Sequence, residues 1–154
     1  MLNLVYKDPM KKYLLLVLLS TLFTSCNINT TSTNHESDKR EAEKITNKFY
    51  HYLEMKEFNE AEKLFSEKFF EVTDKEKLHK IFNHTLNDCG NLTNFSLQEW
   101  NTFVVKGTNP KSEYDFLYKV TRDKKETTER IGMLKENDSI KIVSYHVNFD
   151  MLDE

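Results

Sequence analysis

The chain lacks a set of cysteines, a long apolar run and an excess of basic residues. Its two cysteines, Cys26 and Cys89, exclude a fold held by several disulfides. Its longest apolar run, Tyr13–Phe23, is too short to cross a bilayer, which takes ~20 helical residues. Without the three lysines and one aspartate that precede Cys26, 19 of the 22 basic and 24 of the 25 acidic residues remain, a net charge of −5. This balance argues against binding to nucleic acid or to an anionic lipid surface.

The segment Met10–Cys26 has the parts of a bacterial export signal in their usual order. Two lysines open it, the apolar run follows, and two small residues precede the final cysteine. The last five residues resemble the lipobox of bacterial lipoproteins, although these usually have leucine at the position of Phe23. An ordinary cleaved signal and a chance cysteine are the alternatives. Because Asp8 does not suit a positive leader, we expect translation to begin at Met10 rather than at Met1.

The resemblance to a lipobox implies a location for the protein. Residues 1–25 would be removed, and Cys26 would carry the acyl chains that hold the protein at a lipid bilayer. Asn27 is not the acidic residue that retains some lipoproteins in the inner membrane, which favours the outer membrane of a bacterial cell envelope. Residues 26–37 are polar and aperiodic, which predicts a flexible tether of up to ~40 Å. Residues 38–154 are enough for a single domain.

The first part of that domain has the spacing of helices. A helix is predicted over about residues 39–55, with Asp38 and Glu41 as its cap, because apolar residues recur at Ala42, Ile45, Phe49 and Leu53. A second, shorter helix is predicted over about residues 58–65. The apolar patch that follows, at residues 69–72, is too brief to predict another helix.

A third helix is predicted to begin after the capping box of Thr73 and Glu76 and to end at Gly90. Its apolar residues lie on one face, and Cys89 belongs to that face. A buried free cysteine behaves as a small apolar side chain. No basic cluster lies nearby in the sequence to lower the pKa of the thiol, so we predict a core residue rather than a nucleophile.

The second part changes to a period of two, which is typical of strands. The alternation is clearest at residues 114–121, and further strands are predicted over about residues 95–105, 127–134 and 140–149. Short turns between them indicate an antiparallel meander of four strands. In the last strand the apolar face changes between Ile142 and Val143, which predicts a β-bulge or a bend.

This order of elements resembles the nuclear transport factor 2-like superfamily, also called the cystatin-like or SnoaL-like fold, over about residues 38–149. The resemblance rests on Phe49–Leu53 in the first helix, on Phe58–Phe69 and on the closing strand Ile140–Val147. It implies an α+β cone in which three helices pack into a curved four-stranded antiparallel sheet around a possible pocket. The Asp and His arrangement of the enzyme members finds no match, so no activity is implied.

Candidate catalytic residues are few. Asp115, Tyr118 and His146 lie on predicted strands and would serve as acid and base only if the strand pairing brought them together. A solvated strand face is the alternative for each of them. His79 and His84 are five residues apart on a helix, so they diverge and do not form a metal-binding pair. We predict neither a metal site nor a cofactor.

Three functions of different kinds remain open. A non-catalytic domain that binds a small ligand or a protein partner at the envelope is favoured, because no residue pattern demands chemistry. A small pocket-type enzyme, such as an isomerase, dehydratase or hydrolase, is the second; a deep pocket around two of the candidate residues would support it, and an apolar filling would count against it. The third is a structural module that self-associates as a homodimer through the exposed face of its sheet.

Overall fold

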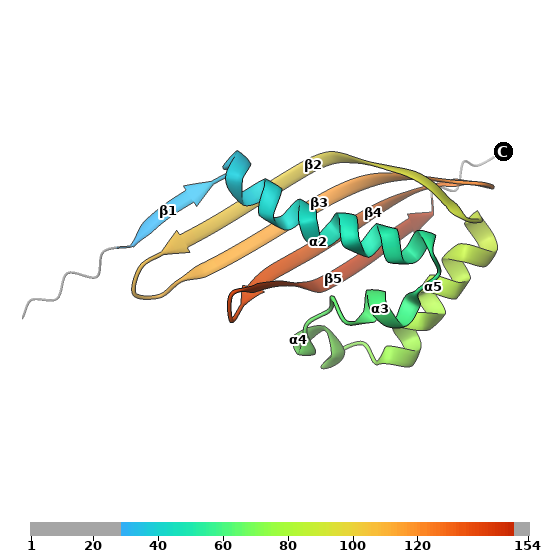
Figure 1. Ribbon diagram of the computed structural model, residues 1–154, viewed down its shortest axis with the longest axis horizontal. Helices are drawn as coiled ribbons and strands as arrows, with labels where there is room; N and C mark the ends of the chain where they lie inside the picture. The colour runs from blue at the N-terminus through green and yellow to red at the C-terminus, as the bar shows by residue number, and fades with distance from the viewer. Residues whose placement is uncertain (1–28, 150–154) are drawn as a thin grey trace, which may run out of the picture.

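The computed structural model describes residues 29–149, which form one antiparallel sheet and four helices (Figure 1). The sheet has the strand order β1-β2-β3-β4-β5, with β1 at Thr30–Thr33, β2 at Leu92–Lys106, β3 at Lys111–Arg122, β4 at Glu126–Glu136 and β5 at Ser139–Phe149. The helices are α2 (Glu36–Glu54), α3 (Phe58–Glu62), α4 (Glu67–Phe70) and α5 (Lys75–Cys89).

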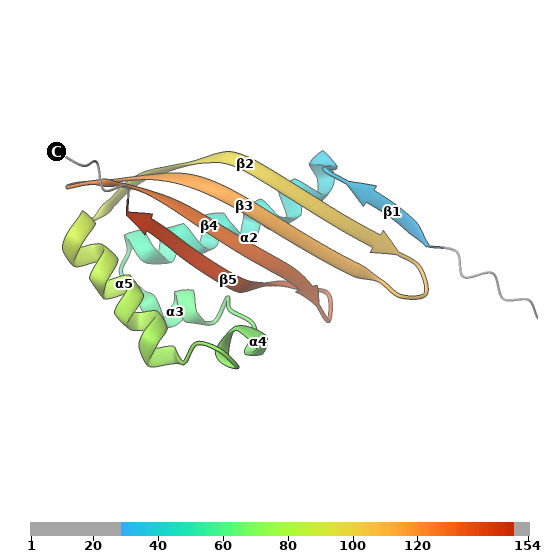
Figure 2. The ribbon, with the colours of Figure 1, turned by 180° about the vertical axis from the view of Figure 1, so that it is seen from behind.

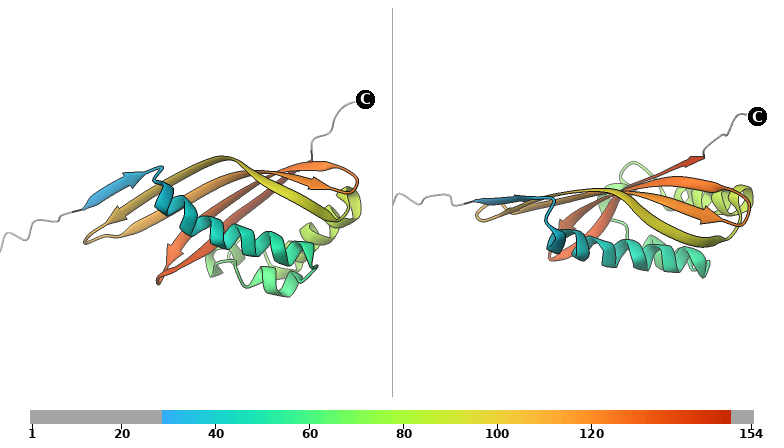
Figure 3. Two further views of the ribbon diagram at one scale, coloured as in Figure 1. Left: turned by 45° about the horizontal axis from the view of Figure 1, so that its top comes forward. Right: turned by 90° about the horizontal axis from the view of Figure 1, so that it is seen from above.

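The helices occupy one side of a twisted sheet. Helix α2 crosses the sheet lengthwise, and α3, α4 and α5 gather beside β5 (Figure 1). Seen from behind, the outer face of the sheet carries no helix (Figure 2). The views in Figure 3 show the strands twisting around one another, as right-handed strand twist requires. The predicted α+β class and the antiparallel meander after the helices are confirmed.

The predicted number of four strands is wrong, because Thr30–Thr33 form a fifth strand at the edge of the sheet. Thr30 pairs with Lys106 and Thr33 with Phe103. These threonines fall in the segment that the sequence assigned to a tether. Threonine suits a strand, but a strand with polar residues on both faces has no apolar alternation to reveal it. The folded part therefore begins at the edge strand, well before residue 38.

Strand β1 also sets the start of α2. The helix begins after His35, which makes no capping hydrogen bond with its side chain. Asp38, which the sequence predicted as the cap, is instead buried and accepts a hydrogen bond from Ser32 Oγ at 3.0 Å. Asn34 turns the chain with a φ of 53°, and its Oδ1 accepts from the Thr102 N–H at 2.9 Å. The edge strand and the first turn of α2 are thereby joined.

The number of helices also differs from the prediction of three. The apolar patch at residues 69–72 contributes to α4, a single turn whose N-cap is Ser66. Ser66 Oγ accepts from the Lys68 N–H at 3.1 Å and donates to the Glu136 carboxylate at 2.9 Å. A helix of one turn is too short to show a helical period in the sequence.

Helix α5 has the predicted end and a different cap. Asp74, and not Thr73, is the N-cap residue, because its carboxylate accepts from the Lys77 N–H at 2.6 Å. Gly90 ends the helix with a φ of 87°. A Cβ at this position would lie 2.9 Å from Asp123 Cβ, so both the backbone angle and the space require glycine.

The predicted bulge in the last strand is confirmed. Gly132 of β4 pairs with Ser144, while the next residue, Met133, pairs with Ile142, so Val143 is the extra residue. The bulge returns Tyr145 to the face of Ile142, and both side chains are buried. The inner face of β5 therefore stays apolar along its length.

Aromatic side chains fill the space between the helices and the sheet. Phe49 of α2 is fully buried, and its ring centroid lies 5.2 Å from that of Tyr145 and 6.0 Å from that of Phe82. Tyr50 stacks on Phe95 at 4.5 Å. The cavity between Phe82 and Tyr145 has a volume of about 10 Å³. This part of the interior is a packed core rather than a ligand pocket.

Candidate functional site

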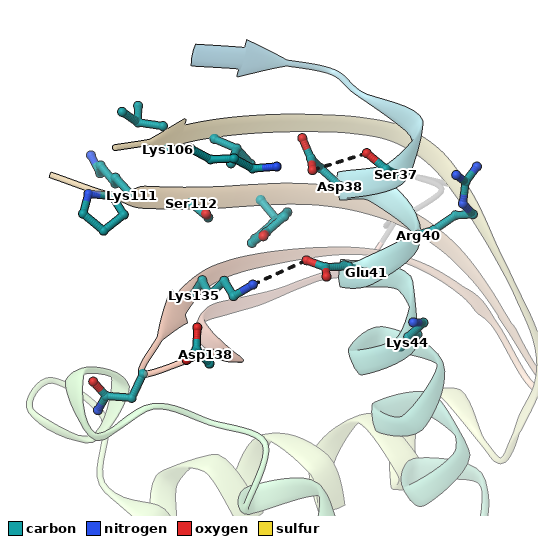
Figure 4. A pocket seen from close by; sticks show the side chains of 15 residues that line it. Ser37, Asp38, Arg40, Glu41, Lys44, Lys106, Lys111, Ser112, Lys135 and Asp138 are labelled. Atoms are coloured by element: carbon teal, nitrogen blue, oxygen red, sulfur yellow. Dashed lines mark hydrogen bonds and ion pairs between the residues drawn. The ribbon is translucent and has the colours of Figure 1, made fainter. Parts of the chain in front are cut away.

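An open basin lies away from the aromatic core, at the end of the sheet where β2 turns into β3. The first turns of α2, the ends of β2 and β3, and the β4–β5 turn enclose a volume of about 850 Å³ (Figure 4). Val104 and Tyr114 line it from the inner face of the sheet, and both are almost fully buried. We refer to this hollow as the basin.

Charged side chains dominate the wall of the basin. Five basic and three acidic residues line it, namely Arg40, Lys44, Lys106, Lys111, Lys135, Asp38, Glu41 and Asp138. Lys135 Nζ reaches toward Glu41 at 3.7 Å from the opposite wall (Figure 4). Lys111 Nζ lies 2.7 Å from Glu113. The basin thus has an excess of positive charge, although the whole chain is acidic.

Three of these cations have no ion-pair partner within residues 29–149: Arg40, Lys44 and Lys106. Arg40 and Lys44 are four residues apart, so they lie on neighbouring turns of α2. Lys106 comes from the end of β2, and it reaches the same basin because α2 packs against that strand. Unpaired cations around an open hollow suit an anionic ligand, which would accept charge-assisted hydrogen bonds.

Tyr114 supplies a neutral hydroxyl to the basin. Burial is the main cause that raises the pKa of Tyr114; the hydrogen bond with Ser112 opposes it, and the weaker effects of the Glu41 and Asp38 charges raise the pKa further. The phenol therefore stays protonated at neutral pH. It adds a hydrogen-bond donor, and no base, to the cationic wall.

A buried polar cluster occupies the inner side of β4. The fully buried carboxylate of Glu129 accepts hydrogen bonds from Arg122 Nη2 at 2.7 Å and from Thr127 Oγ1 at 2.9 Å on Oε1. Its Oε2 accepts from the Tyr145 hydroxyl at 2.8 Å. Burial, followed by the negative charge of Glu129, raises the pKa of Tyr145 and Tyr50 well above the usual value. Neither tyrosine exchanges a proton near neutral pH.

Three polar atoms beside this cluster have no hydrogen-bond partner within the described residues: Tyr50 Oη, Arg122 Nε and Thr85 Oγ1. Arg122 and Thr85 line the cavity of about 10 Å³. A cavity of that size accommodates about one water molecule. The cluster is therefore a structural feature with room for a solvent molecule and not for a substrate.

The structure separates the three candidate catalytic residues. Asp115 and His146 line a shallow hollow of about 520 Å³ on the outer face of the sheet. Arg130 lies between their strands in the register and binds the Asp115 carboxylate through Nε at 2.8 and 3.1 Å. Tyr118 lies on the inner face, where its hydroxyl is 2.6 Å from Thr46 Oγ1. The three side chains do not form one site.

The remaining chemical candidates are structural or lie outside the described residues. His79 Nε2 is 2.9 Å from Glu62, and His84 Nε2 is 3.3 Å from Asp88. Within residues 29–149, no group of three His, Cys, Asp or Glu side chains could hold a metal ion. Cys89 is buried in the core as predicted, and burial raises the pKa of its thiol. Cys26 lies outside the described residues.

The sequence contained one signal of the buried cluster that the interpretation missed. Glu129 occupies an inner position in the alternation of β4, between Thr127 and Ile131. A charged residue in the apolar phase of a strand indicates a buried ion pair. The basin had no comparable signal, because its lysines and arginine resemble ordinary surface residues.

Comparison of the chain with protein-family models, curated proteins and solved structures found no match. Among the helices of residues 29–149, none combines the length and the apolar character needed to span a membrane. The chemistry of the basin and of the outer hollow therefore has to be inferred from their own geometry.

Proposed function

We propose that the protein is a lipid-anchored, non-catalytic binding domain of the bacterial envelope, and that the basin holds an anionic ligand. One observation carries the binding proposal: Arg40, Lys44 and Lys106 line an open volume of about 850 Å³ and have no ion-pair partners within residues 29–149. The order of helices and strands supports a fold of the nuclear transport factor 2-like kind, in which the basin is the open end of the cone.

The packing of the interior supports binding over catalysis. Aromatic rings occupy the space where a pocket-type enzyme would hold its substrate. Asp115 is held by Arg130 on the exposed outer face, and Tyr118 lies on the opposite face. An acid and a base within reach of one reacting atom are what such an enzyme needs.

Titration of the mature chain with inorganic phosphate tests the basin. The chain from residue 26, with Cys26→Ser to keep it free of lipid, is followed through its backbone amide resonances. We expect shifts to concentrate around Arg40, Lys44 and Lys106 and to disappear in Lys44→Gln/Lys106→Gln. The matched control is Lys77→Gln/Lys125→Gln, which removes two exposed lysines elsewhere. Shifts that the control abolishes equally, or no shifts at all, would contradict the proposal.

The anchor has its own test. The parts of an export signal in Met10–Cys26 support it, and mass spectrometry of the mature N-terminus from a bacterial membrane fraction checks it. We expect a first residue Cys26 that carries acyl chains, and a Cys26→Ala variant that is not released from its precursor by the lipoprotein peptidase. An unmodified cysteine would remove the anchor and leave the basin untouched.

Self-association through the outer face is the second candidate. Phe103 is 38% exposed there and lines the hollow around Gly132. Sedimentation velocity of the mature chain, compared with Phe103→Asp, tests it. A concentration-dependent dimer that the variant abolishes would support this candidate, and a monomer at high concentration would remove it.

A further inference from the structure

We propose that the basin end of the domain docks onto the membrane that holds the anchor, and that anionic phospholipid headgroups are the ligands of the basin. This inference rests on the proposed function, because it assumes an acylated Cys26. It adds the identity of the ligand and the orientation of the domain, which follow from where the chain enters the fold and from the local charge.

The chain enters the fold beside the β2–β3 turn. Thr30, the first residue of β1, pairs with Lys106, the last residue of β2. Asn29 Oδ1 accepts a hydrogen bond from the Thr108 N–H of the turn at 3.1 Å. Figure 1 shows β1 starting at the end of the sheet that carries this turn. The N-terminal end of the described fold and the mouth of the basin therefore lie at the same end of the molecule.

The distance available to the anchor is short. Two residues, Asn27 and Ile28, separate Cys26 from Asn29, and the three Cα-to-Cα steps of extended chain span at most about 11 Å. A tether running to residue 37 would have allowed ~40 Å. Because β1 takes up most of that segment, an acylated Cys26 would hold Thr108 close to the headgroup layer, which is several ångströms thick on each side of the hydrocarbon core.

The charge at this end suits an anionic surface. The residues from Val104 to Ser112 include Lys106 and Lys111 and no acidic residue, although Lys111 pairs with the adjoining Glu113 and three acidic residues also line the basin. Arg40 and Lys44 add two cations on the neighbouring wall. A basic residue near an anionic bilayer strengthens binding by about fivefold. The net charge of −5 argued against such a surface for the chain as a whole, but it now favours one orientation, because the acidic remainder is repelled from the bilayer.

Lipid quenching on the acylated protein tests the orientation. The full-length chain is expressed in bacteria, and the mature acylated protein is reconstituted into phosphatidylcholine vesicles with and without phosphatidylglycerol. A fluorescent label is attached at Thr108→Cys, at the basin end, or at Lys125→Cys, in the β3–β4 turn. Cys89 is buried and stays unlabelled. With headgroup-level quencher lipids, we expect at least fivefold stronger quenching at position 108 than at position 125 in the anionic vesicles.

Two further comparisons test the ligand. In anionic vesicles, Lys106→Ala/Lys111→Ala is expected to lower the quenching at position 108 to its level in neutral vesicles, whereas Lys77→Ala/Lys125→Ala is expected to keep the increase. Equal quenching at both label positions would overturn the orientation. Phosphate binding to the soluble chain, together with equal quenching at position 108 in neutral and anionic vesicles, would assign the basin to a soluble anion and overturn the headgroup assignment.

Flotation of the same vesicles separates the two proposals. If the unlabelled mature protein does not float with neutral vesicles, the anchor fails, and the lipid-anchored part of the proposed function fails with it. If the protein floats but position 108 is not quenched, the anchor stands and only the docking inference is overturned.

Discussion

Glu129 is the residue whose environment differs most from that of an ordinary charged side chain. Its fully buried carboxylate holds Arg122, Thr127 and Tyr145 together between β3, β4 and β5. We expect Glu129→Leu to lower the free energy of unfolding by about 3–5 kcal/mol, because it leaves the Arg122 charge buried without a partner. Urea unfolding followed by circular dichroism measures this loss.

The same strand offers a matched control. Glu126 forms an exposed ion pair with Lys119 at 2.9 Å, with both side chains about half exposed at 51%. Glu126→Leu should cost less than about 1 kcal/mol. Replacing both partners of the buried pair, in Arg122→Met/Glu129→Leu, should recover most of the stability. A loss for Glu129→Leu as small as that for Glu126→Leu would show that the buried pair contributes little.

Tyr118 makes stability depend on alkaline pH. Burial raises its pKa to about 12, despite the opposing hydrogen bond with Thr46. The unfolded chain therefore loses this proton near pH 10, before the folded chain does, so the stabilisation is complete below pH 10 and falls as the pH rises toward 12. Tyr118→Phe should remove about 1.4 kcal/mol of the stability lost between pH 9 and pH 11.

Urea unfolding at these two pH values, for the parent and for Tyr118→Phe, gives the difference. Tyr50 and Tyr145 have pKa values raised in the same direction, so the variant should keep part of the alkaline loss. A slope unchanged by the substitution would mean that Tyr118 ionises in the folded protein near its usual pKa.

At the scale of elements, two neighbouring residues, Thr73 and Asp74, are candidates for the N-cap of α5. Asp74 accepts from the Lys77 N–H, whereas the sequence pointed to Thr73. Asp74→Ala should lower the free energy of unfolding by about 1 kcal/mol, since an N-cap side chain satisfies a helix donor that is otherwise unpaired. Thr73→Ala is the control and should change it by less than about 0.5 kcal/mol. If urea unfolding showed a larger loss for Thr73→Ala than for Asp74→Ala, Thr73 would be the N-cap residue, as the sequence predicted.

The elements that the sequence predicted are those with a repeating apolar pattern. The alternation of apolar residues predicts strands β2 to β5, and the helical period together with Gly90 predicts the C-terminal ends of α2 and α5. The change of apolar face in the last strand predicts the bulge at Val143. Strand β1 was not predicted because its residues are polar on both faces and mostly exposed, and it pairs with only one neighbouring strand. Helix α4 was not predicted because four residues are too few to show a period of 3.6 residues. Pairing and length, rather than propensity, decided these two cases.

The basin could not be predicted in the same way. Its cations come from α2 and, more than sixty residues later in the sequence, from the β2–β3 hairpin and from β4. In each segment the charges look like solvated surface, because charged residues are the usual surface residues. Only the packing of α2 on β2 and the Ser32–Asp38 hydrogen bond at the first turn of α2 bring them to one hollow. Asp115 and His146, in contrast, lie on the same face of the sheet because the register of neighbouring strands places them there.

At the scale of the whole molecule, the length of chain between anchor and fold should control the position of the domain. We expect that ten Gly and Ser residues inserted between Ile28 and Asn29 leave acylation and flotation unchanged. The thirteen Cα-to-Cα steps from Cys26 to Asn29 then have a root-mean-square length of about 20 Å, against a maximum of about 11 Å for the natural three steps. Quenching at position 108 in neutral vesicles should fall severalfold, because only the short tether holds the turn there. In anionic vesicles Lys106 and Lys111 should preserve part of it. Equal quenching with and without the insertion in neutral vesicles would mean that tether length does not place the domain.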